Sequence, residues 1–191
     1  MTRGWISKLI EKATGPGFVI ILVLLFAYSF WAFNLDSPWT RALEGAGGIL
    51  PETKPGIPAI EPVRSLDEMT ASKTISDYLL WQALDFPYAA LNFFFAALGM
   101  GLGLKALKLD RSALRFLLLL PAIYVACEIV ENAMLTGFAT GLLPTTETIV
   151  LFQQFATTLK FASGMPAPLL GLLGAVIALA ANLIGRFKKR A

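Results

Sequence analysis

The chain has 191 residues, of which 56% are hydrophobic, and its mean hydropathy is +0.66. Ordinary soluble domains contain about 45–50% apolar residues, so this composition argues against a soluble protein and predicts a membrane protein. The net charge is only +3 and there is no histidine, which argues against a nucleic-acid-binding surface and excludes histidine-ligated zinc or haem and a Ser-His-Asp triad.

The amino-terminal part is predicted to contain a surface helix and a first membrane span. Residues 5–12 combine apolar and charged side chains at helical spacing, which predicts a short amphipathic helix on the inner membrane surface. Residues 17–35 form the first of four apolar stretches long enough to cross a hydrocarbon core of about 30 Å. No small-x-small cleavage pattern follows this stretch, so we expect an uncleaved signal anchor.

Residues 36–87 are expected to form an external loop followed by an external helix. The segment up to residue 64 is rich in glycine and proline and has no apolar period. Ser65-Leu66-Asp67-Glu68 matches a capping box, which predicts that the helix begins there. Pro87 is expected to separate that helix from the second span, residues 88–107, because proline disfavours helical backbone in the residue before it.

The third and fourth spans are predicted over residues 112–136 and 166–187. Residues 146–163 also have helical character, but a continuous helix from 146 to 187 would be roughly 60 Å long, twice the hydrocarbon thickness. We therefore expect a bend at Gly164 and Pro166, with an external or interfacial helix before it. The predicted fold class is all-α: a single polytopic membrane domain over residues 1–191 with four transmembrane helices plus amphipathic and external helices.

The distribution of charge predicts the orientation of the chain. Most of its basic residues fall on one side if the amino terminus is cytoplasmic, whereas acidic residues are concentrated between residues 36 and 85. The positive-inside rule therefore predicts that both termini are cytoplasmic.

Small residues form stripes on the second and fourth spans, a pattern that permits close helix approach. We predict tight packing within the bundle, with an oligomer or partner interface as the alternative. The residues concerned are Gly99, Gly103, Ala167, Gly171, Gly174, Ala178, Ala181 and Gly185.

The third span carries acidic side chains at a depth where an ionised carboxylate costs roughly 2.5–3.5 kcal/mol or more. Glu128 and Glu131 share one helix face with Tyr124, and Asn132 lies beside it. Asp85 enters the second span from the same side, and Lys160 approaches at a similar depth. We predict that these side chains meet near the outer boundary in a cluster made of Asp85, Tyr124, Glu128, Glu131, Asn132 and Lys160.

Three interpretations of this cluster stay open. It forms a buried ion-pair and hydrogen-bond network that fixes helix register, or it forms a proton-sharing carboxylate pair or a polar pocket for a ligand head group. A calcium site is the weakest interpretation, because two or three acids fall short of the six to eight oxygens that calcium prefers. We assign no catalytic residue, no metal and no cofactor.

Three motifs carry a resemblance to a known family. They are Leu84-Asp85-Phe86-Pro87-Tyr88, Leu118-Leu119-Leu120-Pro121 followed by Glu128-Ile129-Val130-Glu131-Asn132, and Thr158-Leu159-Lys160. With them the chain resembles, over residues 65–182, a family of small, uncharacterised bacterial four-helix membrane proteins. In that family the position of Glu128 is commonly aspartate. The resemblance implies a location in the bacterial inner membrane and implies no activity.

From these patterns we expect an integral membrane protein that binds a partner protein or a lipid, as an accessory subunit of a larger membrane complex or as a homo-oligomer. The alternative is a membrane-embedded enzyme that uses paired carboxylates on a lipid or isoprenoid substrate. A proton or ion path comes third, because the first and fourth spans carry no charge at the bilayer centre. The lipid bilayer itself is an expected partner and nucleic acid is not.

Overall fold

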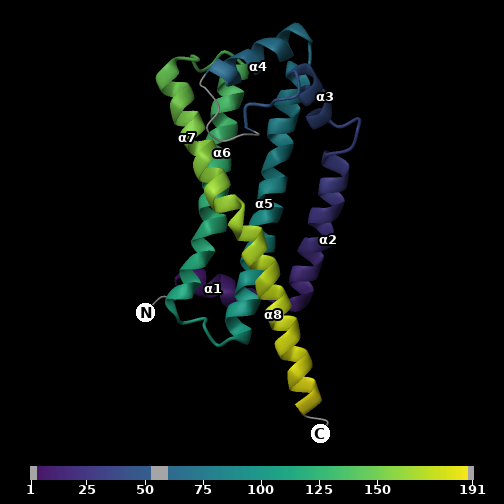
Figure 1. Ribbon diagram of the computed structural model, residues 1–191, viewed down its shortest axis with the longest axis vertical. Helices are drawn as coiled ribbons and strands as arrows, with labels where there is room; N and C mark the ends of the chain where they lie inside the picture. Colours follow the sequence, from purple (N-terminus) through teal and green to yellow (C-terminus); the bar gives the residue numbers. More distant parts are fainter. Residues whose placement is uncertain (1–3, 53–59, 189–191) are drawn as a thin grey trace. The chain divides into compact units, whose positions relative to one another are not determined.

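The computed structural model describes residues 4–52 and 60–188, and within these ranges all regular structure is helical. The predicted all-α fold class is therefore confirmed for the described residues. In chain order the elements are α1 (Trp5–Lys12), α2 (Gly15–Ala32), α3 (Pro38–Gly45), α4 (Ile60–Ala71), α5 (Ile75–Ala106), the 3-10 helix η1 (Ala113–Leu118), α6 (Leu119–Ala139), α7 (Glu147–Gly164) and α8 (Pro166–Lys188) (Figure 1).

Four helical stretches in the described residues are long and apolar enough to cross a membrane, as the sequence predicts. They are Gly15–Ala32, Ile75–Ala106, Ala113–Ala139 and Glu147–Phe187. The last stretch contains both α7 and α8, and the break between them falls at Met165, between Gly164 and Pro166. The helix is therefore interrupted at the predicted position.

The chain divides into two compact units, which are described separately. The first unit contains residues 4–25, 90–123 and 163–188 of the described chain, and the second contains residues 26–52, 60–89 and 124–162. The core of the first unit is built from small and aliphatic side chains of α1, α5, η1 and α8. Its buried residues are Ile10, Ala96, Ala97, Met100, Leu104, Leu118 and Ala167.

In the first unit the backbones of α5 and α8 come into direct contact where both helices carry glycine. A Cβ atom added to Gly99 would lie 2.1 Å from the carbonyl oxygen of Gly171, and one added to Gly103 would lie 2.6 Å from the Cα of Gly174. Such an approach is possible only without side chains. The small-residue faces of the two helices therefore pack against each other in this unit.

The small-residue stripe of α8 is packed over only part of its length. Ala167 and Ala178 are buried, whereas Ala181 is exposed and a Cβ atom added to Gly185 would have no atom within 4 Å. The reason is the length of the partner helix. Because α5 ends at Ala106, soon after the contact at Gly103, the last turns of α8 have no α5 turn to face.

The second unit contains α3 and α4, the first part of α5, most of α6, and α7 up to residue 162. Part of the predicted external loop is helical and forms α3. The Ser37 hydroxyl caps this helix by accepting a hydrogen bond from the Thr40 amide at 3.1 Å, and Pro38 occupies the first helical position. The predicted capping box at Ser65 is wrong. Ser65 lies inside α4, and its hydroxyl donates to the Ile49 carbonyl at 2.9 Å.

The expected junction at Pro87 is also wrong, because α5 continues through this proline for a total of 32 residues. Proline lacks the amide hydrogen that would bond to the preceding turn of the helix. In that turn the hydroxyl of Tyr28 donates to the Leu84 carbonyl at 2.5 Å, so a side chain supports the weakened region. The break in helix comes earlier, at Lys73, where φ is +63° and the Thr74 amide bonds to the Met69 carbonyl at 2.9 Å.

Candidate functional site

Three helices of the second unit bring buried polar side chains together. We call these residues the polar cluster, and each is less than 9% exposed. The cluster comprises Asp85 from α5, Glu128, Glu131 and Asn132 from α6, and Gln153, Thr157 and Lys160 from α7. Five of the six residues predicted from the sequence therefore belong to one site.

Lys160 is the central cation of the polar cluster. Its ammonium group forms an ion pair with Glu131 Oε2 and lies 3.5 Å from Glu128 Oε1. Glu131 also accepts hydrogen bonds at Oε1 from the Thr157 hydroxyl and, at 3.4 Å, from Gln153 Nε2. Both oxygens of Glu131 are thus occupied, which allows this side chain to be 0% exposed.

Asp85 is held in the cluster by the side-chain amide of Asn132. Asn132 Nδ2 donates to Asp85 Oδ2 at 3.2 Å, and Glu128 lies one helical turn before Asn132 on the same face of α6. Glu128 Oε2 has no hydrogen-bond partner among the described residues.

Tyr124 is the one predicted residue that stays outside the cluster. It shares the α6 face with Glu128 but is only half-buried, and it forms no hydrogen bond to cluster residues within the described chain. The ring therefore contributes to packing at the edge of the site, and no polar role is assigned to its hydroxyl.

Glu52 is a buried acid next to the cluster that the sequence interpretation missed. It accepts hydrogen bonds from the Tyr78 hydroxyl at 3.0 Å and from Gln82 Nε2 at 3.3 Å, and it is 6% exposed. Burial and, to a smaller extent, the negative charge of Glu131 raise the pKa of Glu52 to about 7, against the opposing effect of Lys160.

A sequence signal for this extension exists on α5. Tyr78, Gln82 and Asp85 are separated by four and three residues and therefore share one helix face. Their polar atoms indicate that this face turns toward other polar groups. The loop that carries Glu52 gives no comparable signal, because it has no periodicity.

The polarity of α7 is inverted relative to a helix on a water-soluble protein. The side chains of Gln153, Gln154, Thr157 and Lys160 are buried at 8% exposure or less, whereas large apolar side chains face outward. These outward residues are Leu151, Phe152, Phe155 and Leu159, with exposures between 38% and 63%. A helix with this arrangement is matched to an apolar environment.

The site has more hydrogen-bond acceptors than donors. Four buried oxygens lack a donor among the described residues: Gln82 Oε1, Glu128 Oε2, Asn132 Oδ1 and Gln154 Oε1. An unsatisfied buried polar atom costs about 1–3 kcal/mol. One of these oxygens belongs to the Glu128 carboxyl group, which becomes a hydrogen-bond donor when it carries a proton.

A metal has no prepared position in the described part of the chain, where no group of three or more acidic or cysteine side chains is arranged to hold an ion. The calcium interpretation thus gains no support from the arrangement of these acids. No family model, curated protein or solved structure matches this chain.

Proposed function

We propose that this chain is an integral membrane protein of the binding type, in which the polar cluster holds a proton and thereby fixes the relative position of α5, α6 and α7. The observation that carries the proposal is the inverted polarity of α7, with its buried lysine among acids and its exposed leucine and phenylalanine side chains. The helix faces outside the cluster bind a lipid or a partner membrane protein.

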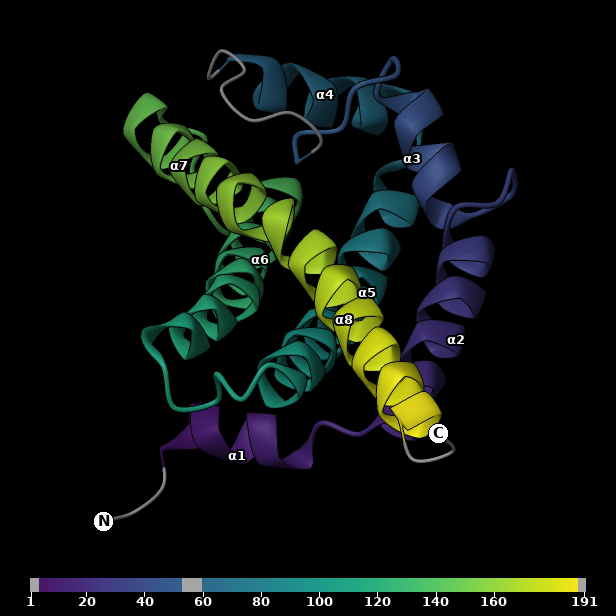
Figure 2. The same ribbon diagram turned by 60° about the horizontal axis from the view of Figure 1, so that its bottom comes forward.

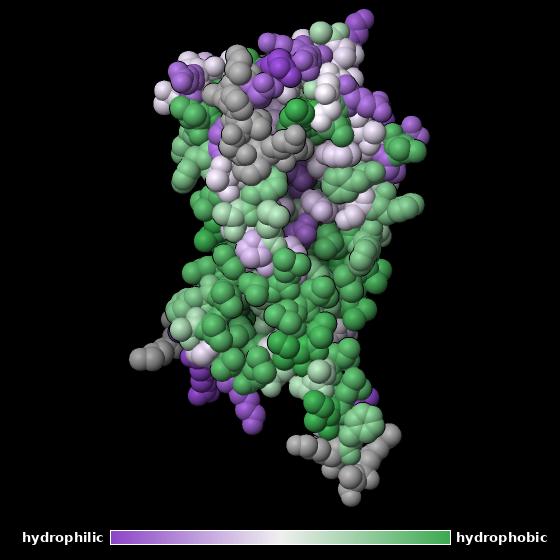
Figure 3. Space-filling model, in the orientation of Figure 1, coloured by the Kyte–Doolittle hydropathy of each residue, from purple (hydrophilic) through white to green (hydrophobic). Residues whose placement is uncertain are grey.

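Insertion into a membrane is supported by the surface of the helices. Figure 3 shows hydrophobic residues over α8, whose exposed side chains include Leu169, Leu173 and Leu179 at 54% to 70% exposure. Hydrophilic residues gather over α3 and α4 in the same view. This division fits lipid around the long helices and water around the short ones. We retain the predicted location in a bacterial inner membrane with both termini cytoplasmic.

Charge balance supports the bound proton. Among the described residues the cluster contains one ammonium group, on Lys160, and three carboxyl groups, on Asp85, Glu128 and Glu131. Removal of each ion from water costs several kcal/mol unless a counter-ion offsets it. One ammonium offsets one carboxylate fully, and a proton held by Glu128 lowers the remaining charge without a cavity.

A proton in this position links protonation to conformation. The Asn132–Asp85 hydrogen bond joins α5 to α6, and the Lys160 contacts join α6 to α7. Loss of this proton would add a second uncompensated negative charge to the buried cluster and favour separation of the helices that form it. The polar cluster would then respond to a ligand or a partner that stabilises one arrangement of these helices.

The alternative of a membrane-embedded enzyme receives less support from the geometry. General acid and base groups must lie within hydrogen-bonding distance of a substrate. Glu128 is 2% exposed and Glu131 is 0% exposed, and Lys160 occupies the space between them. The roles as accessory subunit and as homo-oligomer stay predictions, to be checked by purification after mild solubilisation and mass spectrometry of proteins and lipids.

Infrared spectroscopy of the protein in lipid vesicles tests the proposed proton. The measurement is made at a pH well above 7, where Glu52 is ionised. The wild type should show the carbonyl band of a protonated carboxyl group, and Glu128→Gln should lose it. Glu147→Gln removes an exposed acid at the start of α7 and should leave the band unchanged. A wild-type spectrum with only ionised carboxylates at that pH would refute the proposal.

A further inference from the structure

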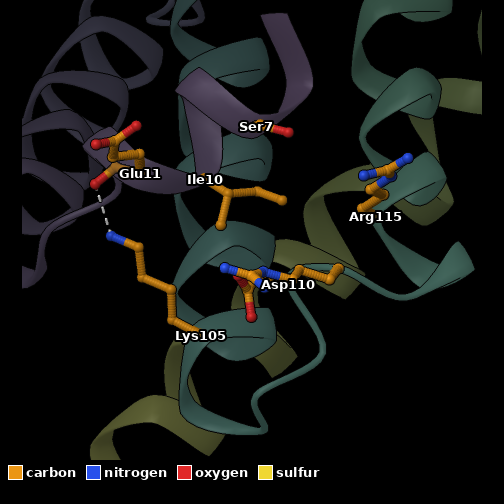
Figure 4. Close-up of a pocket in the computed structure, with 7 residues that line it drawn as sticks. Ser7, Ile10, Glu11, Lys105, Asp110 and Arg115 are labelled. Carbon is orange, nitrogen blue, oxygen red and sulfur yellow. Dashed lines mark hydrogen bonds between the residues drawn. The ribbon is translucent and has the colours of Figure 1, made fainter. Parts of the chain in front are cut away.

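A second polar site lies in the first unit, where α1 crosses the end of α5 beside η1. It is a pocket of about 640 Å³, within the size range of small-molecule sites. We call it the basic pocket. Its polar lining consists of Ser7, Glu11, Lys105, Asp110, Arg111 and Arg115. Figure 4 shows Lys105 on one side of Ile10 and Arg115 on the other.

The wall formed by α1 is fixed to α5. Lys105 Nζ donates to the carbonyl oxygens of Glu11 at 2.8 Å and Ala13 at 2.7 Å, so its charge lies at the negative end of the α1 dipole (Figure 2 shows α1 beside the end of α5). Ile10 is 3% exposed in the core of this unit, and Ala13 comes within 2.8 Å of a Cβ atom added to Gly101. The pocket is therefore preformed on this side.

The cations of the basic pocket are available to an anion. Among the described residues neither Arg111 nor Arg115 forms an ion pair, and the hydrogen bonds of Lys105 go to carbonyl groups rather than to carboxylates. The Arg115 guanidinium lies over the Phe116 ring, 5.1 Å from its centroid, an arrangement that leaves its N–H groups directed sideways. Three cations face two carboxylates in the lining.

An apolar hollow adjoins the basic pocket. It has a volume of about 180 Å³, and Ser7 and Arg115 line both spaces. The other side chains of the hollow are Trp5, Ile6 and Phe116. A ligand that fills both spaces must have an anionic group next to an apolar body, and a phospholipid has this structure. A free phosphate ion would occupy the basic pocket alone.

We propose that the basic pocket binds the phosphate of an anionic phospholipid, with Arg111 and Arg115 as its ligands and the apolar hollow taking the adjoining part of the lipid. Guanidinium groups bind phosphate oxygens through paired N–H donors, and basic pockets at membrane surfaces bind anionic head groups. The amphipathic α1, which carries Lys8 and Lys12 on its exposed side, places the pocket at the level of the head groups. The inference depends on the proposed function only for membrane insertion.

Thermal unfolding in detergent with added lipid tests the site. Phosphatidylglycerol should raise the melting temperature of the wild type in a saturable way, whereas phosphatidylcholine should not. Arg115→Gln and Arg111→Gln should each weaken the apparent affinity for phosphatidylglycerol about tenfold, the effect expected for loss of a charged hydrogen bond. Lys8→Gln also removes one positive charge, but from a side chain of α1 that does not line the pocket, so this variant should bind phosphatidylglycerol like the wild type.

Three results would overturn the assignment. An equal loss in Lys8→Gln would mean that the lipid is attracted by net charge alone, and equal stabilisation by inorganic phosphate would mean a free-anion site. Absence of saturable stabilisation in the wild type would mean that there is no lipid site. Arg111 is exposed, so Arg111→Gln should fold normally. This variant still tests the site if Arg115→Gln unfolds in the absence of lipid. None of these results affects the infrared test of the polar cluster.

Discussion

Replacement of Gly99 by alanine should weaken the contact between α5 and α8. The new Cβ atom would lie 2.1 Å from the Gly171 carbonyl oxygen and 2.6 Å from its carbonyl carbon, where an ordinary contact begins at 3.4 Å. Both obstructing atoms belong to the backbone of α8, so no side chain can rotate away. The helices must separate locally by roughly an ångström, a gap that forfeits about half of the dispersion energy of the facing atoms.

The expected cost follows from two opposing terms. Insertion of a methyl group into a packed interior costs about 1–3 kcal/mol, and the rigid obstruction here favours the upper end. Alanine recovers about 1 kcal/mol through its higher helix propensity. The net loss is about 2 kcal/mol, which corresponds to a fall in Tm of roughly 4–8 °C for a chain of this size.

Gly185→Ala is the matched control. Gly185 belongs to the same stripe of α8, and its added Cβ atom would have no atom within 4 Å. This variant should keep or slightly raise the Tm, because it gains helix propensity without a clash. Thermal unfolding in detergent, followed by circular dichroism, compares both variants with the wild type. If Gly99→Ala is as stable as the wild type, or if Gly185→Ala loses as much, the packing argument is wrong.

Three further predictions concern charge and backbone. Lys160→Ala leaves Glu131 buried without its cation and should lower the free energy of unfolding by about 3–5 kcal/mol in denaturant titrations. Adding Glu131→Gln should restore part of this loss. If nothing is restored, the ion pair is not the source of the loss. The pKa of Glu52 is raised to about 7, so this side chain contributes stability that is fully present below its ordinary pKa and is lost as the pH rises through 7, by up to about 3 kcal/mol. Glu52→Gln should therefore flatten the pH dependence of Tm. An unchanged pH profile would show that Glu52 is not its cause. Lys108 has φ of +58° after the end of α5, so Lys108→Gly should raise stability by about 0.5–1 kcal/mol in thermal unfolding, and a lower Tm would show that the left-handed backbone carries no strain.

Local periodicity was sufficient to predict most of the polar cluster. Glu128, Glu131 and Asn132 lie on one face of α6 because helical spacing fixes that face regardless of tertiary structure. The inverted polarity of α7 explains why Lys160 meets them. The end of α7 at Gly164 was predictable for a similar reason, since glycine and the following Pro166 act on the local backbone.

Tertiary contacts decided the features that sequence reasoning missed. Ser65 has the sequence context of a helix cap, but its hydroxyl bonds to the Ile49 carbonyl in the preceding loop. Pro87 continues a helix because the surrounding structure, including the Tyr28 hydroxyl, tolerates the missing amide bond. Glu52 reaches Tyr78 and Gln82 through the path of an irregular loop, and no local rule encodes such a path.

The inverted polarity of α7 also constrains how the protein is made. If the chain enters a bilayer during synthesis, α7 follows α5 and α6, so its amide and ammonium groups are covered only once those two helices are in place. Before that moment Lys160 would retain its hydration, and afterwards Glu131 takes the place of water. Because both acids precede their lysine in the chain, the buried ion pairs can form only after α7 has been made.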